Sequence, residues 1–127
     1  RVAHFLKQHP GVSKVYWPGF PDHPGHAIAQ GQMRDFGGMI SFELKSEKEE
    51  DAKRMASYTK VFALAESLGG VESLIGHPAS MTHASIPRPQ RLASGVSDTL
   101  LRLSVGIEGA DDLMMDLDQA IRRALGL

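Results

Sequence analysis

Residues 65–75 read Ala-Glu-Ser-Leu-Gly-Gly-Val-Glu-Ser-Leu-Ile, and they follow the apolar run Val-Phe-Ala-Leu-Ala at 61–65. The apolar run is typical of a buried strand, which we expect over residues 61–66. This strand ends in the polar pair Glu66 and Ser67, followed by two glycines that let the backbone approach a ligand closely. Because binding residues are often carried on loops at strand ends, this turn is the first candidate site.

A second strand, predicted over residues 100–105, carries a single charged residue, Arg102, in an otherwise apolar sequence. Side chains alternate between the two faces of a strand, so Arg102 points away from the main apolar row. A guanidinium group stays protonated in proteins, and it needs an anionic partner wherever it is shielded from water. Two partners remain open: an acid of the chain such as Glu43 or Glu72, which the pattern alone slightly favours, or the carboxylate of a ligand.

The remaining sequence alternates between helical and strand patterns. β-Branched and aromatic residues predict a strand over 12–17, and apolar alternation predicts another over 39–44. The spacing of Ser46 and Glu49 matches a capping box at the start of an amphipathic helix over 47–58. Further helical patterns cover residues 1–9, 26–30, 90–94 and 111–125. Residues 76–89 contain three prolines and are expected to form a long, functional loop.

These elements predict the α/β class, as a two-layer α+β sandwich. The expected sheet is mixed and mostly antiparallel, with about four strands and with helices packed on one face. At 127 residues and 42% hydrophobic content, the chain is long enough for one domain with a real core, residues 1–127, and too short for two. It begins at Arg1 inside an apolar helical pattern, which suggests a piece of a longer protein.

Composition narrows the classes of partner. The net charge of −1, from 14 basic and 15 acidic residues, gives no electrostatic reason to expect nucleic acid or an anionic membrane surface. No apolar run approaches the roughly 20 residues that span a bilayer. The absence of cysteine fits a reducing compartment, so we expect a cytoplasmic protein without disulfides or thiolate metal sites.

Motifs for bond-breaking chemistry are missing from the sequence. The six histidines form no His-Glu-x-x-His pattern, so no metal site is expected. Ser67 does not lie in a Gly-x-Ser-x-Gly elbow, and no Lys-Ser or Lys-Thr follows Gly69 and Gly70 as a phosphate loop requires. The residues by themselves therefore predict a carboxylate clamp and no catalytic residue. A free-standing amino-acid-binding module would also fit this pattern.

Five segments resemble, in order, the carboxy-terminal portion of the pyridoxal-phosphate-dependent enzymes of Cys/Met metabolism. They are residues 17–19, 37–42, 64–75, 77–83 and 101–108. The resemblance extends over essentially the whole chain. It implies the C-terminal small domain of a fold type I enzyme, which leans over an active site built by a larger cofactor domain.

The resemblance also implies roles for individual residues. Arg102 would bind the substrate α-carboxylate, and Ser67 would help to hold that carboxylate and the cofactor-bearing lysine. Leu68, in the same stretch, would also contact the substrate. Glu66 is similar to the acid of the cystathionine γ-synthase and γ-lyase branch, where it faces the distal amino group of cystathionine. The expected substrates are cystathionine, or a homoserine ester plus cysteine.

The same resemblance places the cofactor-bearing lysine, the phosphate-binding residues and the ring-stacking tyrosine in an upstream domain. This chain would then contain no catalytic or cofactor-binding residue and would be inactive alone. The parent enzyme would be a homotetramer that makes or breaks carbon–sulfur bonds. Other activities in the family remain alternatives: cystathionine β-lyase, methionine γ-lyase and O-acyl-homoserine sulfhydrylase.

Overall fold

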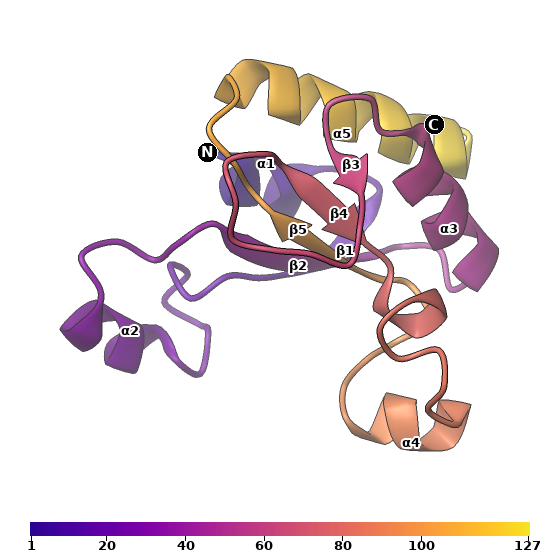
Figure 1. Cartoon of the computed structure of the whole chain (residues 1–127), viewed down its shortest axis with the longest axis horizontal. Helices are drawn as coiled ribbons and strands as arrows, with labels where there is room; N and C mark the ends of the chain where they lie inside the picture. The colour runs from indigo at the N-terminus through magenta and orange to yellow at the C-terminus, as the bar shows by residue number, and fades with distance from the viewer.

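The computed structural model describes all 127 residues of the chain. Figure 1 shows the strands at the centre of the molecule, with the N terminus of the chain at α1 and its C terminus at the end of α5. The elements are α1 (Val2–Gln8), β1 (Val12–Tyr16), α2 (His26–Gln32), β2 (Met39–Leu44), α3 (Glu49–Tyr58), β3 (Ala63–Leu64), β4 (Leu74–Gly76), the 3-10 turn η1 (Pro78–Ser80), α4 (Arg88–Ala93), β5 (Leu100–Ser104) and α5 (Ala110–Leu125).

The strands form one sheet in the order β1-β2-β5-β4-β3. Neighbouring strands are antiparallel, except that β3 and β4 run parallel. The sheet is therefore mixed and mostly antiparallel, as predicted, but it has five strands because residues 74–76 form a strand of their own. The register of β1 on β2 shifts between Val12 and Lys14, where the Ser13 hydroxyl donates to the Glu43 and Leu44 carbonyls.

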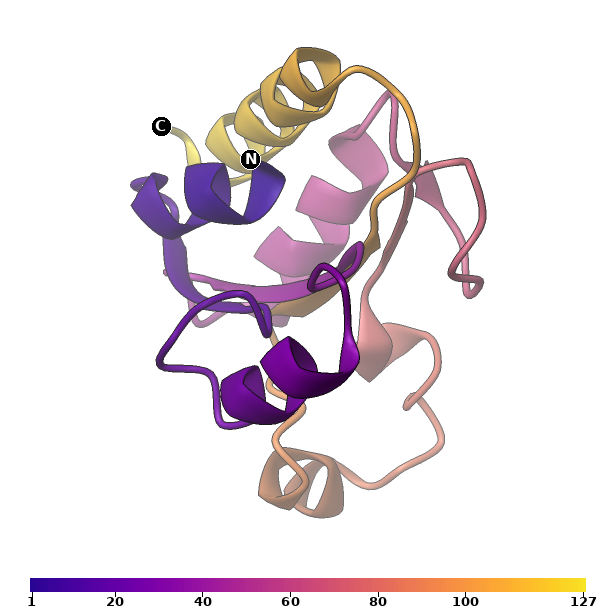
Figure 2. The same ribbon diagram turned by 90° about the vertical axis from the view of Figure 1, so that its left-hand side faces the viewer.

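Helices α1, α3 and α5 cover one face of the sheet, while α2 and α4 lie beyond the other face (Figure 2). Twenty buried apolar side chains form the core. Leu113, Leu117 and Ile121 of α5 belong to this core, within the helix that the sequence predicted over residues 111–125. Each such side chain contributes roughly 1.5–3 kcal/mol of hydrophobic stabilisation. The predicted arrangement of helices on one face is confirmed for the three helices that make the core.

The strand predicted over residues 61–66 is wrong in extent and in burial. Only Ala63 and Leu64 are paired as a strand, and both are exposed because β3 is the outermost strand. Phe62 is the only fully buried side chain of the apolar run. A short apolar run does not reveal from sequence whether it will lie inside a sheet or at its edge.

The backbone before β3 is instead fixed by α5. The buried carboxylate of Asp116 accepts the backbone N–H groups of Lys60, Val61 and Phe62 at 2.7, 2.8 and 3.0 Å. These three N–H groups bind a side chain of helix α5, and not the carbonyl groups of a neighbouring strand. The Asp116 carboxylate thus holds Phe62 against the core from a position more than fifty residues later in the chain.

The capping box predicted from Ser46 and Glu49 is also wrong. Helix α3 begins at Glu49 with Lys48 as its N-cap and has no side-chain cap. The Ser46 hydroxyl accepts the Lys48 N–H at 3.2 Å and donates to the Asp51 carboxylate. Ser46 therefore stabilises the turn before the helix. The long loop predicted over 76–89 contains the turn η1 and the start of α4, and α4 begins two residues earlier than expected.

His9, at the end of α1, has a side chain that is only 1% exposed. Its Nδ1 accepts the Gly11 N–H at 3.0 Å, so the ring proton lies on Nε2, which donates to Asp118 at 3.1 Å. Burial lowers the pKa of His9 below its ordinary value. A proton added to Nδ1 would face the Gly11 N–H and break this hydrogen bond. The folded state therefore stabilises the neutral form of the His9 ring.

We expect this histidine to make stability depend on pH. Because the folded pKa of His9 lies below that of the unfolded chain, about 6.5, the unfolded state binds more protons between the two values. The contribution of His9 is then complete above about pH 6.5 and is lost as the pH falls through the lowered folded pKa. Chemical denaturation should show that the stability difference between the native protein and a His9→Leu variant shrinks from pH 7.5 to pH 5. A difference that stays constant would contradict this expectation.

Candidate functional site

Arg102 lies on β5, the central strand of the sheet. Its neighbours Leu101 and Leu103 are buried in the core, so the half-buried Arg102 points to the opposite face, as predicted. Across the sheet it pairs with Ser41 of β2 and Gly76 of β4. Both neighbours are small residues.

No acid of the chain neutralises Arg102. The ion pairs of the structure involve other arginines, lysines and His9, and none includes Arg102. Glu43 instead accepts a hydrogen bond from the Tyr16 hydroxyl at 3.0 Å, and Glu72 is exposed. The two acids considered from the sequence are therefore not partners of this guanidinium.

A small cleft brings Arg102 together with Glu66. The residues that line it are Ala65, Glu66, Gly76, His77, Pro78, Met81, Thr82 and Arg102. Of the four residues proposed as substrate-binding, two share this cleft, whereas Ser67 and Leu68 lie outside its lining. One wall is the beginning of the loop over 65–73, and the other is the segment that follows β4.

The loop over 65–73 is tied to β5 and to the residues after it. At its tip the Gly69 N–H donates to the Ser104 hydroxyl at 2.8 Å, with Gly69 in the left-handed region at φ 82°. At its base, Ser73 donates from its backbone N–H and its hydroxyl to the Glu108 carboxylate at 2.9 and 2.8 Å. These donors, the backbone N–H of Ser73 first, lower the pKa of Glu108.

Gly106 allows the loop base to pass close to the end of β5. A Cβ on Gly106 would lie 2.1 Å from the Val71 carbonyl oxygen, which no side chain could accommodate without moving the loop. The Gly106 N–H also donates to the Ser73 hydroxyl at 2.8 Å. The sequence pattern does not point to Ser73, Ser104 or Glu108, because a hydroxyl or carboxylate that contacts a distant backbone leaves no spacing signal.

The second wall of the cleft is fixed by His77, which is almost fully buried. One ring nitrogen lies 2.6 Å from the Ser80 hydroxyl and the other 2.7 Å from the Asp98 carbonyl oxygen. The Asp98 carboxylate pairs with Arg88 and Arg91 at 2.8 and 2.6 Å, and these hydrogen bonds lower the pKa of Asp98 to about 2. The segment predicted to be irregular is thus well anchored.

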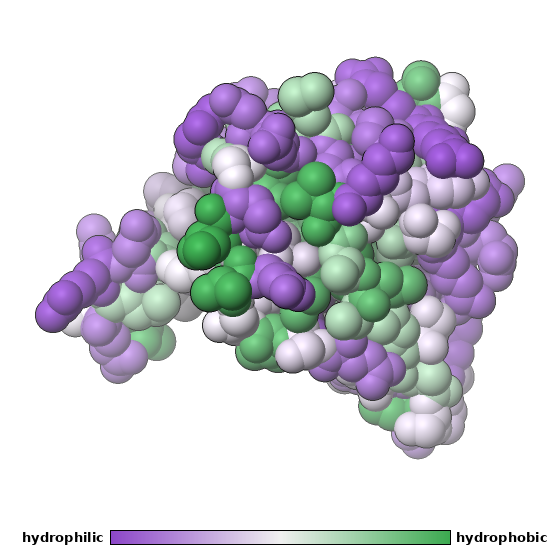
Figure 3. Space-filling model, turned by 45° about the horizontal axis from the view of Figure 1, so that its top comes forward, coloured by the Kyte–Doolittle hydropathy of each residue, from purple (hydrophilic) through white to green (hydrophobic).

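Several large apolar side chains on and around the loop remain uncovered. Figure 3 shows hydrophobic residues gathered near the middle of one face, with hydrophilic residues around them. The exposed apolar residues of this part of the chain include Leu64, Leu68, Val71 and Ile107. Leu68 is 55% exposed, so its side chain does not pack into the core of the domain.

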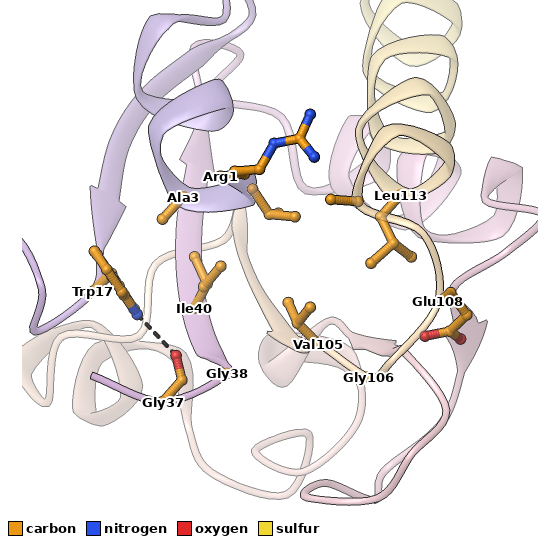
Figure 4. Close-up of a pocket in the computed structure, with 12 residues that line it drawn as sticks. Arg1, Ala3, Trp17, Gly37, Gly38, Ile40, Val105, Gly106, Glu108 and Leu113 are labelled. Carbon is orange, nitrogen blue, oxygen red and sulfur yellow. Dashed lines mark hydrogen bonds between the residues drawn. The ribbon is translucent and has the colours of Figure 1, made fainter. Parts of the chain in front are cut away.

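A separate hollow lies just beyond the C-terminal end of β5 (Figure 4). Trp17, Ile40, Val105 and Leu113 contribute apolar side chains, and the Trp17 indole N–H donates to the Gly37 carbonyl at 3.1 Å. Arg102 and Glu66 do not line this hollow.

No three His, Asp or Glu side chains come together as a metal-binding group. No helix of the structure is both long enough and apolar enough to cross a membrane.

The fold and the cleft define a small α/β domain that offers an unpaired guanidinium on its open sheet face. The chain belongs to the Cys/Met metabolism PLP-dependent enzyme family, whose sequence model matches residues 1–122. The resemblance stated from the sequence is thereby confirmed. Enzymes of this family depend on pyridoxal phosphate, and this chain is a segment of such an enzyme.

The relatives carry several activities. The chain is 55% identical over 121 residues to cystathionine β-lyase of Coxiella burnetii, and 54% identical over 121 residues to cystathionine γ-lyase of Bacillus subtilis. In both cases the match covers 95% of this chain and 31% of the relative. The chain therefore spans just under a third of the length of these relatives, and their nearly equal identities do not separate the activities.

Solved structures confirm the fold. Cystathionine γ-synthase from Xanthomonas oryzae pv. oryzae in complex with cystathionine superposes with a TM-score of 0.89 at 51% identity. The match covers 98% of this chain and 32% of that chain. Cystathionine γ-lyase from Lactobacillus plantarum complexed with L-serine gives a TM-score of 0.86 at 48% identity over 97% of this chain and 32% of that chain.

The residues present do not themselves form a site for the cofactor. A covalent site for an aldehyde cofactor needs a lysine in the cleft. The cleft beside Arg102 has none, and every lysine of the chain is exposed. The cleft therefore presents a guanidinium and a carboxylate, but no amine that could hold the cofactor.

Proposed function

We propose that residues 1–127 are the C-terminal substrate-binding domain of a pyridoxal-phosphate-dependent transsulfuration enzyme of the cystathionine γ-synthase or γ-lyase type. The observation that carries the proposal is Arg102, a half-buried guanidinium on the open face of the sheet without an acidic partner in the chain. The relatives named as cystathionine enzymes support the substrate class.

In this proposal Arg102 binds the α-carboxylate of the amino-acid substrate. Its planar fork can donate two parallel hydrogen bonds to a carboxylate, which fixes the orientation of the bound amino acid as well as its position. Orientation matters because only one of the bonds at the α-carbon is to be broken. Ser67 and Leu68, exposed on the same loop, would contact the substrate from the side of the loop.

Glu66 would recognise the other end of the substrate. Its side chain is exposed and lines the cleft with Arg102, so one cleft offers a cation and an anion. A diamino dicarboxylate such as cystathionine carries the complementary groups: a carboxylate for Arg102 and a distal ammonium for Glu66. This pairing is the physical reason to favour cystathionine as the substrate.

The whole enzyme, expressed from its complete reading frame, tests the proposal by product analysis. Both eliminations of cystathionine consume one water: γ-elimination gives cysteine, ammonia and 2-oxobutanoate, whereas β-elimination gives homocysteine, ammonia and pyruvate. With cysteine and an O-acyl-homoserine, γ-replacement gives cystathionine and the free acid. The γ products would support the proposal. Pyruvate as the main product would establish the β-lyase alternative, the activity in the name of the Coxiella burnetii relative.

A Glu66→Ala variant tests the role of the distal contact. It should raise KM for cystathionine by about tenfold, the effect of one charge-assisted hydrogen bond of about 1.5 kcal/mol. The same variant should leave KM nearly unchanged for an amino acid without a distal ammonium. Equal changes for both substrates would show that Glu66 does not face that group.

A further inference from the structure

The loop over 65–73 has to return across the end of the sheet, because β3 and β4 are parallel. Several of its hydrogen bonds reach one short segment that follows Arg102. Gly69 is bound to Ser104, the Val71 carbonyl accepts the Ile107 N–H at 3.0 Å, and Ser73 is bound to Glu108. The position of the loop relative to Arg102 is therefore set by residues 104–108.

Among these residues, Ser104 lies on the same strand as Arg102 and binds the tip of the loop. It lies two residues after Arg102 on the same strand and thus on the same face, and it is only 3% exposed. In the sheet it pairs with Met39 on one side and Leu74 on the other, so the strand cannot shift beneath it. Its hydroxyl accepts the N–H of Gly69 at the tip of the loop, 2.8 Å away.

The side chains of Glu66, Ser67 and Leu68 are exposed, and packing inside the chain does not hold them. Their place is set by the backbone, of which Gly69 is the next residue. Gly69 adopts φ 82°, a conformation that lets the loop turn sharply but does not fix its direction. The hydrogen bond from the Gly69 N–H to the Ser104 hydroxyl fixes the direction in which the loop continues.

We propose that Ser104 is a positioning residue for substrate binding: its hydroxyl holds Gly69 and thereby sets Glu66, Ser67 and Leu68 at a fixed distance from Arg102. The inference rests on the proposed function of Arg102 and Glu66 and extends it to a residue that need not touch the substrate. Misplacement of a binding group by even about 1 Å lowers the rate of an enzyme substantially.

The test compares Ser104→Ala with Thr99→Val in the whole enzyme. Thr99 is a similarly buried hydroxyl residue, 6% exposed, just before β5. Ser104→Ala should raise KM for cystathionine three- to tenfold with a smaller change in kcat, whereas Thr99→Val should leave both constants near those of the native enzyme. Since the Gly69 N–H can bond to water when the loop moves, the melting temperature of Ser104→Ala should stay close to that of Thr99→Val.

A double-variant cycle separates positioning from a general structural role. If Ser104 acts through the loop, combining Ser104→Ala with Glu66→Ala should raise KM by less than the product of the two single effects. Independent, multiplicative effects would overturn the inference, as would a Ser104→Ala variant that loses activity only in proportion to its unfolded fraction. If Arg102→Ala left KM unchanged, the proposed function itself would fail. If Arg102→Ala raised KM strongly while Ser104→Ala kept the KM of the native enzyme, only the role of Ser104 would be refuted.

Discussion

Replacing Arg102 with alanine in the whole enzyme is expected to lower kcat/KM for the amino-acid substrate by about 10²- to 10³-fold. The side chain lies on the open face of the central strand with no acidic partner in the chain, so its loss leaves no buried carboxylate unpaired. The substitution is therefore expected to weaken substrate binding and not the folded structure. Two charge-assisted hydrogen bonds are worth about 3–4 kcal/mol together, which corresponds to this range.

The kinetic constants show where the loss occurs. KM should rise strongly because the substrate loses its main anchor, and kcat should fall as well because the bound amino acid is no longer held in one orientation. Arg102→Lys should recover part of the loss in KM and little of the loss in kcat, since an ammonium supplies charge without the planar fork. Arg122→Ala, which removes an exposed arginine of α5, is the matched control. Similar losses in Arg102→Ala and Arg122→Ala would contradict the assignment.

Asp116→Ala is expected to destabilise the protein by about 3 kcal/mol. The variant removes the acceptor of three backbone N–H groups, from Lys60 to Phe62, at a site where Asp116 is buried. Alanine cannot accept any of these bonds, and a buried donor without a partner costs about 1–3 kcal/mol. The segment should detach from α5 and expose Phe62, which is 2% exposed in the native structure.

Hydrogen–deuterium exchange measures this effect locally, and thermal unfolding measures it globally. The amide protons of Val61 and Phe62 should exchange far faster in Asp116→Ala, while those of β2 and β5 change only as overall stability requires. Asp112→Ala, which replaces an exposed aspartate in the first turn of the same helix, should leave both measurements almost unchanged. Native protection at Val61 and Phe62 in Asp116→Ala would refute the role given to this carboxylate.

The sequence predicted those features that depend on periodicity. Alternation over 100–105 placed Arg102 on the face opposite the core, and the helical pattern over 111–125 predicted helix α5. The resemblance of five ordered segments identified the family. Each of these signals is repeated along the chain, so that a single exceptional residue does not hide it.

Features that depend on one contact between distant residues were not predictable. The apolar run over 61–65 suggested a buried strand, but its backbone is bound by Asp116, and its two paired residues lie at the sheet edge. The cleft depends on Ser104 and Ser73, whose hydroxyls bind backbone groups about 35 residues away in the sequence. Serine is common in loops and strands alike, and its partner is decided only by the three-dimensional fold.

The shortness of β3 has a consequence for the behaviour of the protein in solution. A sheet whose outer strand is long and flat can pair with another molecule and grow into aggregates. Here one outer strand is two residues long, and the other, β1, is distorted by the shift in register next to Ser13. Neither border of the sheet provides the straight row of free backbone groups that a second molecule would need. The domain can therefore keep its apolar loop exposed without its sheet serving as a template for self-association.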